Sequence, residues 1–304
     1  MQHGGHAATG AATGTTTAAA WLLLAQPDLH PARSIAVVAV AGLYVAGWAL
    51  GNDIDHDKSF VTKSGGPFTR VIAEVLQWLA RHVYRWTRKD CDKPGSGKNG
   101  EHRGLLHTWP GALTIALALA IGSTYTPWVA RIASVLILSA AIRSLAYSLN
   151  LHRNKRTRDL TTRWGALTAA IILTATWDGT ALLPTGPALG VLAFVGMLTH
   201  NAGDGATAYG VPWKFFFPHW CDRCRGKVNA ARCGSWFQRA PWHFLRCGQC
   251  KQARDRPKCA RWDRSNNTPA FLRFTTGAGV ERLITVTSLV TAGTITIAAP
   301  LAMS

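Results

Sequence analysis

Long apolar stretches alternate with polar, mostly basic segments along this chain. Seven stretches are rich in alanine, glycine, leucine and threonine and contain almost no lysine or arginine. They cover residues 10–24, 35–50, 112–123, 129–149, 164–177, 187–199 and 283–303. A helix needs about 20 residues to cross a bilayer, and several stretches reach that length only with their polar flanks. Because small residues also allow close helix packing in lipid, the pattern predicts an all-α multipass transmembrane bundle of five to seven spans.

Residues 67–86 show a different pattern, with apolar residues at every third or fourth position among arginines. The apolar positions are Val71, Ile72, Val75, Leu76, Leu79, Val83 and Trp86. This spacing predicts an amphipathic helix. Such a helix lies on the membrane surface or over the site, or it packs on a cytoplasmic subdomain.

The chain is strongly basic, with 33 Lys and Arg against 15 Asp and Glu. In a soluble protein this excess would indicate nucleic-acid binding. When the chain is threaded through seven spans, 29 of the 33 basic residues fall on one side, in residues 51–108, 150–163 and 200–275. Cytoplasmic loops carry such an excess, so we expect a bacterial-type inner or plasma membrane with this side in the cytoplasm. The first stretch lacks the basic residues that precede an export signal, so we expect it to be retained as a span.

Four groups of histidine and aspartate lie where the apolar stretches begin or end, and the threading places all of them on the basic side. They are His6; Asp53, Asp55 and His56; His102 and His107; and His200 and Asp204. Imidazole and carboxylate are the ligands of hydrolytic metal sites. Ionisable groups at the ends of apolar helices are costly and are usually functional. We therefore expect one or more divalent ions, with zinc as the first choice, bound by His6, Asp55, His102, His107, His200 and Asp204.

The spacing within these groups indicates how each would face a metal. His200 and Asp204 are four residues apart and share one face of a helix. In an extended segment, Asp53 and Asp55 would point to one side and His56 to the other. Either both aspartates then face the metal, or one binds it while the other orients a histidine.

The remaining groups suggest supporting roles. His102 and His107 are five residues apart, which fits His102 on the turn that enters a helix and His107 on its first turn. Arg103 lies between them, and its guanidinium would neutralise an anionic substrate group. Asp53 or His56 would support the ligands or act as a general base.

In order and approximate spacing these motifs resemble those of the YdjM-like membrane-bound metal-dependent hydrolases. The matching segments are His6 to Gly10, residues 52–59, residues 102–108, and His200-x3-Asp204-x2-Thr207-x2-Gly210. Two positions depart from the family pattern: Asn52 stands for proline and Thr108 for serine. The resemblance covers residues 1–218 and the last span. It implies an integral-membrane hydrolase, and a further likeness to zinc-dependent phospholipases C and single-strand nucleases implies a phosphoester cleaved by a metal-activated water.

Six of the seven cysteines form a repeat in the second large loop. The two halves are Cys221-x2-Cys224-x8-Cys233 and Cys247-x2-Cys250-x8-Cys259, with His219 and His243 nearby. They predict structural zinc, held either by three cysteines and a histidine in each half or by both CxxC pairs together. A reducing cytoplasm argues against disulfides. Aromatic residues among the basic ones suit anionic lipid or single-stranded nucleic acid.

The predicted organisation is a membrane-embedded hydrolase core at 1–218, a basic cysteine-rich insertion at 219–262 and a C-terminal transmembrane helix at 263–304. The expected partners are membrane lipid and a phosphoester substrate. The alternative is a non-enzymatic membrane anchor whose basic zinc module binds nucleic acid or anionic lipid. A transporter is disfavoured, because its ionisable groups would lie near the middle of the membrane rather than at helix ends.

Overall fold

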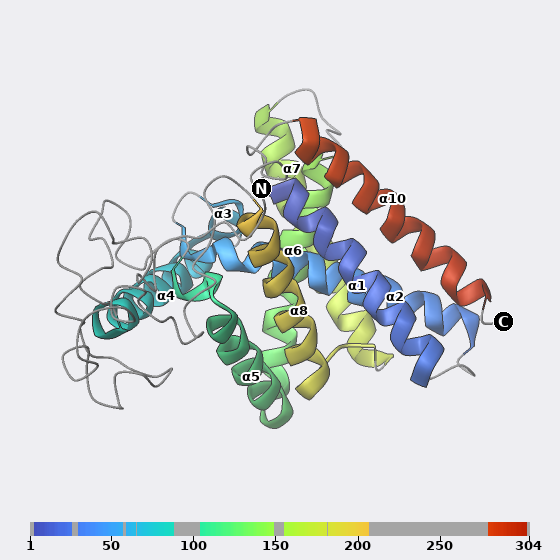
Figure 1. The fold of residues 1–304 in the computed structure, drawn as a ribbon, viewed down its shortest axis with the longest axis horizontal. Helices are drawn as coiled ribbons and strands as arrows, with labels where there is room; N and C mark the ends of the chain where they lie inside the picture. The colour runs from blue at the N-terminus through green and yellow to red at the C-terminus, as the bar shows by residue number, and fades with distance from the viewer. Residues whose placement is uncertain are drawn as a thin grey trace, which may run out of the picture.

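The computed structural model describes residues 3–25, 30–56, 59–64, 66–87, 104–148, 155–180, 182–206 and 279–302. Within these ranges every regular element is helical. The long helices of the bundle are α1 (His3–Ala25), α2 (Pro31–Gly51), α5 (Trp109–Tyr125), α6 (Pro127–Ser148), α7 (Lys155–Gly179), α8 (Gly186–Gly205) and α10 (Gly279–Ala302) (Figure 1). Each contains the described part of one predicted apolar stretch. The all-α prediction is therefore confirmed for the described part of the chain.

Two of the described helices are long and apolar enough to cross a membrane, judged by length and composition. These candidate spans cover Pro31–Asp55 and Pro127–Tyr147. Shorter apolar helices cover Trp109–Tyr125 and Leu283–Ala298. The count of five to seven spans remains a prediction.

Helices α1 and α2 lie side by side because small residues meet across their contact (Figure 1). A Cβ added at Gly14 would lie 2.6 Å from the carbonyl oxygen of Ala41, and one at Gly10 would lie 2.8 Å from Cα of Ala46. On α8, a Cβ at Gly196 would lie 2.8 Å from the carbonyl oxygen of Val45. Glycine therefore lets the backbones of α1 and α8 approach α2 closely, as is typical of helices packed in lipid.

Replacing Gly14 with alanine is expected to lower the thermal unfolding midpoint of the detergent-purified protein. The added methyl group would press on the backbone of α2, and overpacking of this kind costs about 1–3 kcal/mol. Gly165→Ala on α7 is the matched control, because a Cβ there meets nothing within 4 Å. Alanine also favours a helix over glycine by about 1 kcal/mol, so the control midpoint should hold or rise. Equal midpoints for the two variants would contradict the close packing of α1 on α2.

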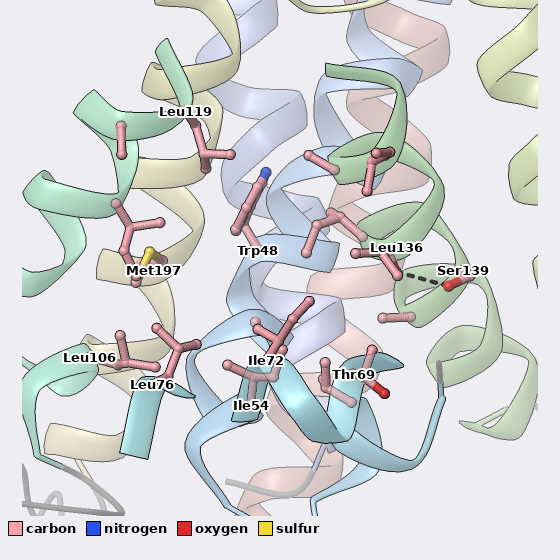
Figure 2. A pocket seen from close by; sticks show the side chains of 18 of the residues that line it. Trp48, Ile54, Thr69, Ile72, Leu76, Leu106, Leu119, Leu136, Ser139 and Met197 are labelled. Carbon is pink, nitrogen blue, oxygen red and sulfur yellow. Dashed lines mark hydrogen bonds between the residues drawn. The ribbon is translucent and has the colours of Figure 1, made fainter. Parts of the chain in front are cut away.

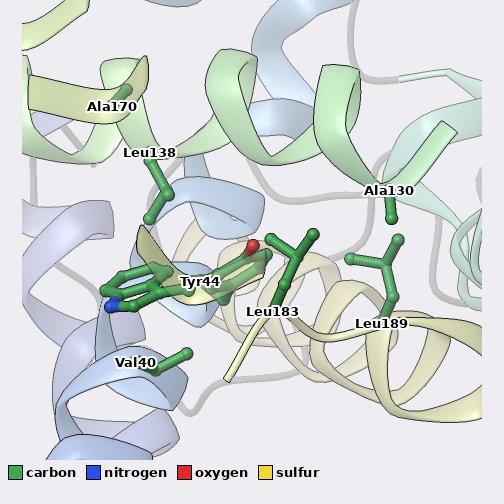
Figure 3. Close-up of a cluster of buried hydrophobic side chains, with 8 residues drawn as sticks. Val40, Tyr44, Ala130, Leu138, Ala170, Leu183 and Leu189 are labelled. Atoms are coloured by element: carbon green, nitrogen blue, oxygen red, sulfur yellow. The ribbon is translucent and has the colours of Figure 1, made fainter. Parts of the chain in front are cut away.

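A buried apolar cluster joins α2, α6, α7 and the start of α8 (Figure 3). It consists of Val40, Tyr44, Ala130, Leu138, Ala170, Trp177, Leu183 and Leu189. The Tyr44 hydroxyl donates to Oγ of Ser134, which in turn donates to the carbonyl oxygen of Ala130. This chain of hydrogen bonds satisfies the buried hydroxyls and fixes α2 against α6.

Short elements close one end of the bundle. The 3-10 turn η1 (Asn52–Asp55) follows α2, and the 3-10 turn η2 (Leu105–His107) precedes α5. Between them come α3 (Phe60–Ser64) and α4 (Gly66–Thr87), and α4 contacts both turns. The helix predicted at 67–86 is therefore confirmed.

Helix α4 carries apolar residues on two faces. Its inner face buries Thr69, Ala73, Ala80 and Tyr84. The exposed apolar side chains on its outer face are Phe68, Val71, Val75, Trp78 and Leu79. This outer face is the feature that an amphipathic helix on a membrane surface would need.

Candidate metal centre

Six of the predicted site residues meet at the end of the bundle that the 3-10 turns close. They are His6 from α1, Asp53 and Asp55 from η1, His107 from η2, and His200 and Asp204 from α8. Figure 1 shows the N-terminus of α1 beside the last turns of α8. Groups up to about 200 positions apart in the chain thus come together because α1, α2, α5 and α8 all begin or end here.

Four of these residues direct one donor atom each toward a common point. The donor atoms offered by Asp53, His107, His200 and Asp204 all lie within 4.8 Å of one another. Nε2 of His107 is 3.1 Å from Nε2 of His200. Oδ1 of Asp53 is 3.7 Å from Nε2 of His107 and 3.6 Å from Nε2 of His200. Oδ2 of Asp204 is 3.8 Å from Nε2 of His107 and 3.5 Å from Nε2 of His200.

These distances fit a single divalent ion. Bonds of about 2.1 Å in a tetrahedral site place neighbouring ligand atoms about 3.4 Å apart. The five nitrogen–nitrogen and nitrogen–oxygen distances given above, 3.1 to 3.8 Å, lie around that value. Two imidazoles with two carboxylates also form a donor set that zinc and similar transition metals accept.

A hydrogen bond on the side of the ring away from the other donors fixes the orientation of His200. Its Nδ1 donates a hydrogen bond to the backbone carbonyl oxygen of Ala49 on α2. A carbonyl oxygen only accepts, so the proton is on Nδ1 and the lone pair of Nε2 faces the other donors. Histidine ligands of metal sites are held in this way by a carbonyl or a carboxylate.

His107 lies between carboxylates on both sides of its ring. Asp53 faces Nε2, while Oδ2 of Asp55 is 3.7 Å from Nδ1. Burial by itself would lower the pKa of His107, but Asp53 and Asp55 outweigh it and raise the pKa to about 9. The carboxylates around this ring therefore favour a positive charge at its position.

His6 is buried and contacts two of the four convergent residues, His200 and Asp204. Its ring stacks on His200, with centroids 3.8 Å apart and planes at 17°. Its Nε2 lies 3.3 Å from Oδ1 of Asp204, whose other oxygen faces His107 and His200. Asp204 is thus held between His6 and the two inward-facing imidazoles.

Asn52 is a structural member of the site that the sequence analysis noted only as a departure from proline. Its side-chain amide donates to the carbonyl oxygen of Met197 and to Oδ1 of Asn201. These bonds connect the end of α2 to α8 at Met197, one turn before His200, and at Asn201, directly after it. The signal for this role was weak, because Asn201 lies beside a motif histidine but is itself no ligand type.

Comparison with known proteins places the chain in a family. A family model described as YdjM inner membrane protein matches residues 1–262. The chain belongs to the YdjM inner membrane protein family. The search of the curated proteins and the search of the solved structures found no match.

This match confirms the resemblance that the motifs indicated. The YdjM family is a family of inner membrane proteins. The matched range continues past residue 218 to residue 262. It therefore includes the cysteine segment, which the motif resemblance left out.

The segment after α2 differs from the extended backbone expected from the sequence. It forms the 3-10 turn η1, in which successive side chains rotate by about 120°. Asp53 and Asp55 therefore do not point to one side. Asp53 faces the other donors, and Asp55 lies behind His107, whereas the sequence interpretation made Asp55 the ligand and gave Asp53 the supporting role.

His56 and the position of His107 relative to α5 can be compared with the sequence prediction, whereas the remaining predicted residues lie outside the described part of the chain. His56 follows η1 in extended backbone, and its carbonyl oxygen accepts from the Thr62 hydroxyl. It is outside the four-residue group of the described region. His107 ends η2 rather than lying on the first turn of α5. His102, Arg103 and the six cysteines of 219–262 lie outside the described residues.

Proposed function

We propose that this chain is a multipass membrane hydrolase that uses a divalent metal, zinc in the first instance, to cleave phosphoesters at the cytoplasmic face. The observation that carries the proposal is the convergence of Asp53, His107, His200 and Asp204. Membership of the YdjM inner membrane protein family supports the membrane location.

The proposed ligands are Asp53, His107, His200 and Asp204. When bound there, the ion would polarise a phosphoryl oxygen and make a water molecule more acidic. Asp55 and the Ala49 carbonyl would hold the two imidazoles in position, and His6 would hold Asp204.

The side from which a substrate approaches follows from burial. The side chain of Asp53 is 26% exposed, whereas those of His107, His200 and Asp204 are at most 1% exposed. A phosphoester would therefore approach past Asp53. Arg103, two residues before η2, is proposed to neutralise its charge, and His102 to add a further ligand.

The proposed orientation follows from the positive charge of the loops. The end of the bundle with the metal centre would face the cytoplasm, since the basic segments 51–108 and 150–163 belong to that end. The outer apolar face of α4 would then lie in the lipid headgroup region. The cysteine segment 219–262 is proposed as a structural zinc module on the same side.

Metal removal tests the proposed function. We expect the detergent-purified full chain to hydrolyse bis(p-nitrophenyl) phosphate, and a chelator that strips the metal to reduce the rate to background. Added zinc should restore it, because the chemistry depends on the ion. Full hydrolysis by a chain stripped of metal would rule out the proposal.

A further inference from the structure

A cavity of about 450 Å³ lies beside the metal centre (Figure 2). Its walls come from α2, η1, α3, α4, η2, α5, α6 and α8. In Figure 2 Leu106 and Met197 line one side, Leu136 and Ser139 the other, and Trp48 stands between them. The volume is within the range of ligand pockets, about 300–1,000 Å³.

The lining is almost entirely hydrocarbon. Aliphatic side chains of leucine, isoleucine, valine and alanine make up most of it. Its two hydroxyls are used internally: Thr69 donates to the carbonyl oxygens of Thr62 and Gly66, and Ser139 donates to that of Leu136. An occupant of this cavity would be recognised by apolar contact, which suits a hydrocarbon chain.

The cavity and the metal centre share the same backbone elements. Ile54 lines the cavity between Asp53 and Asp55, and Leu106 lines it directly before His107. Met197 lines it one turn before His200 on α8. Neighbouring side chains of a 3-10 turn point in different directions. Therefore η1 and η2 present carboxylate and imidazole groups to the metal centre, and they present Ile54 and Leu106 to the cavity.

The cavity also reaches the outer surface of the bundle. Two of its lining residues, Ala118 on α5 and Ile132 on α6, are exposed, and Ile132 is 50% exposed. The opening therefore lies between two apolar helices. In a chain that spans a membrane, such an opening faces the hydrocarbon of the bilayer.

We propose that this cavity holds an acyl chain of a lipid substrate while its phosphoester lies at the metal centre. The proposal rests on the proposed function and adds the substrate class, a phospholipid. A chain entering between α5 and α6 would have its headgroup end at Ile54 and Leu106, beside Asp53 and His107.

Photolabelling tests the position of the chain without requiring catalysis. The probe is phosphatidylglycerol with a diazirine on one acyl chain, in phosphatidylethanolamine vesicles that contain the full-length protein. We expect label on Ile137 and Ala140, which are 6% and 1% exposed and which lipid around the bundle does not reach. Label confined to outward positions such as Ile171 and Ile172 would overturn the proposal.

A cavity-filling variant provides the matched comparison. Ala133→Phe places a ring in the cavity, and Ala118→Phe does so at its opening if the first variant does not fold. Either should remove the label from Ile137 and Ala140, whereas Ile172→Phe, on the exposed face of α7, should retain it. Label that persists in a folded cavity-filling variant would overturn the proposal.

Kinetics separate this inference from the proposed function. Ala133→Phe should lower the ratio of kcat/KM for long-chain over short-chain phosphatidylglycerol at least tenfold, because each buried methylene contributes up to about fourfold. An unchanged ratio would overturn the acyl-chain site alone. If the wild-type protein cleaves neither lipid nor bis(p-nitrophenyl) phosphate, the proposed function fails, and the labelling still decides whether the cavity holds a chain.

Discussion

Replacing both His200 and Asp204 with alanine is expected to abolish phosphodiester hydrolysis. The change removes two of the four convergent donors, both of them buried, and leaves His107 and Asp53 without a shared ion. Loss of one preorganised group that stabilises charge in a transition state costs about 100- to 1,000-fold in rate, so the pair should cost about 1,000-fold or more. The rate of bis(p-nitrophenyl) phosphate hydrolysis by equal amounts of folded protein measures the effect.

The control variant for this experiment removes the same two residue types elsewhere. His30 caps α2 at its start, and Asp178 pairs with Arg131 near the end of α7, so both lie away from the site end of their helices. The His30→Ala, Asp178→Ala protein should retain wild-type hydrolysis. A His200→Ala, Asp204→Ala protein as active as this control would show that the cluster is not the catalytic centre.

The two aspartates of η1 should differ in their effect on metal affinity. Asp53→Asn removes a carboxylate from the four-residue group and should weaken metal binding by more than about 100-fold. Asp55 instead lies 3.7 Å from the far nitrogen of His107, so Asp55→Asn should weaken binding by about 10- to 100-fold, the range for groups that orient a ligand. Competition with a chromophoric chelator measures both affinities.

The order of these two effects distinguishes the structure from the sequence interpretation. Asparagine has nearly the volume of aspartate, so both variants should fold with wild-type helix content by circular dichroism. A larger loss of affinity for Asp55→Asn than for Asp53→Asn would return Asp55 to the ligand role that the sequence pattern assigned to it.

The helices and the location of the site could be predicted because they depend on local pattern. Apolar runs long enough to form helices identify α1, α2, α5, α6, α7, α8 and α10 without knowledge of their neighbours. Consistent alternation of helix direction then brings His6, Asp53, His107 and His200 to one end. His200 and Asp204 are four residues apart, and this spacing alone predicts that they share one face of a helix.

The orientations of Asp53 and Asp55 could not be predicted because distant residues determine the backbone of η1. Gln77 of α4 donates to the carbonyl oxygen of Asp55, and Thr62 donates to that of Ile54. These contacts come from elements that fold back over the turn, and no local pattern in residues 52–56 reveals them. A segment with two polar residues at alternate positions fits a strand or a 3-10 turn equally well until its partners are known.

The cavity was likewise beyond the sequence analysis. Ala118, Ala133 and Ala140 belong to ordinary apolar runs, and only the arrangement of the helices in space makes them line one cavity. The pairing of His6 with Asp204 also depends on the close contact of α1 with α2, which brings the start of α1 beside the end of α8.

The metal content of a full-length chain in which the six cysteines of 219–262 are replaced by serine tests the central claim most directly. This background removes the second predicted metal module and leaves the His/Asp cluster intact. Elemental analysis should find at least one divalent ion per chain, and X-ray absorption should show nitrogen and oxygen ligands at about 2.0–2.2 Å without sulfur. A metal content no higher than that of the same chain with His200→Ala and Asp204→Ala would contradict a metal site at this cluster.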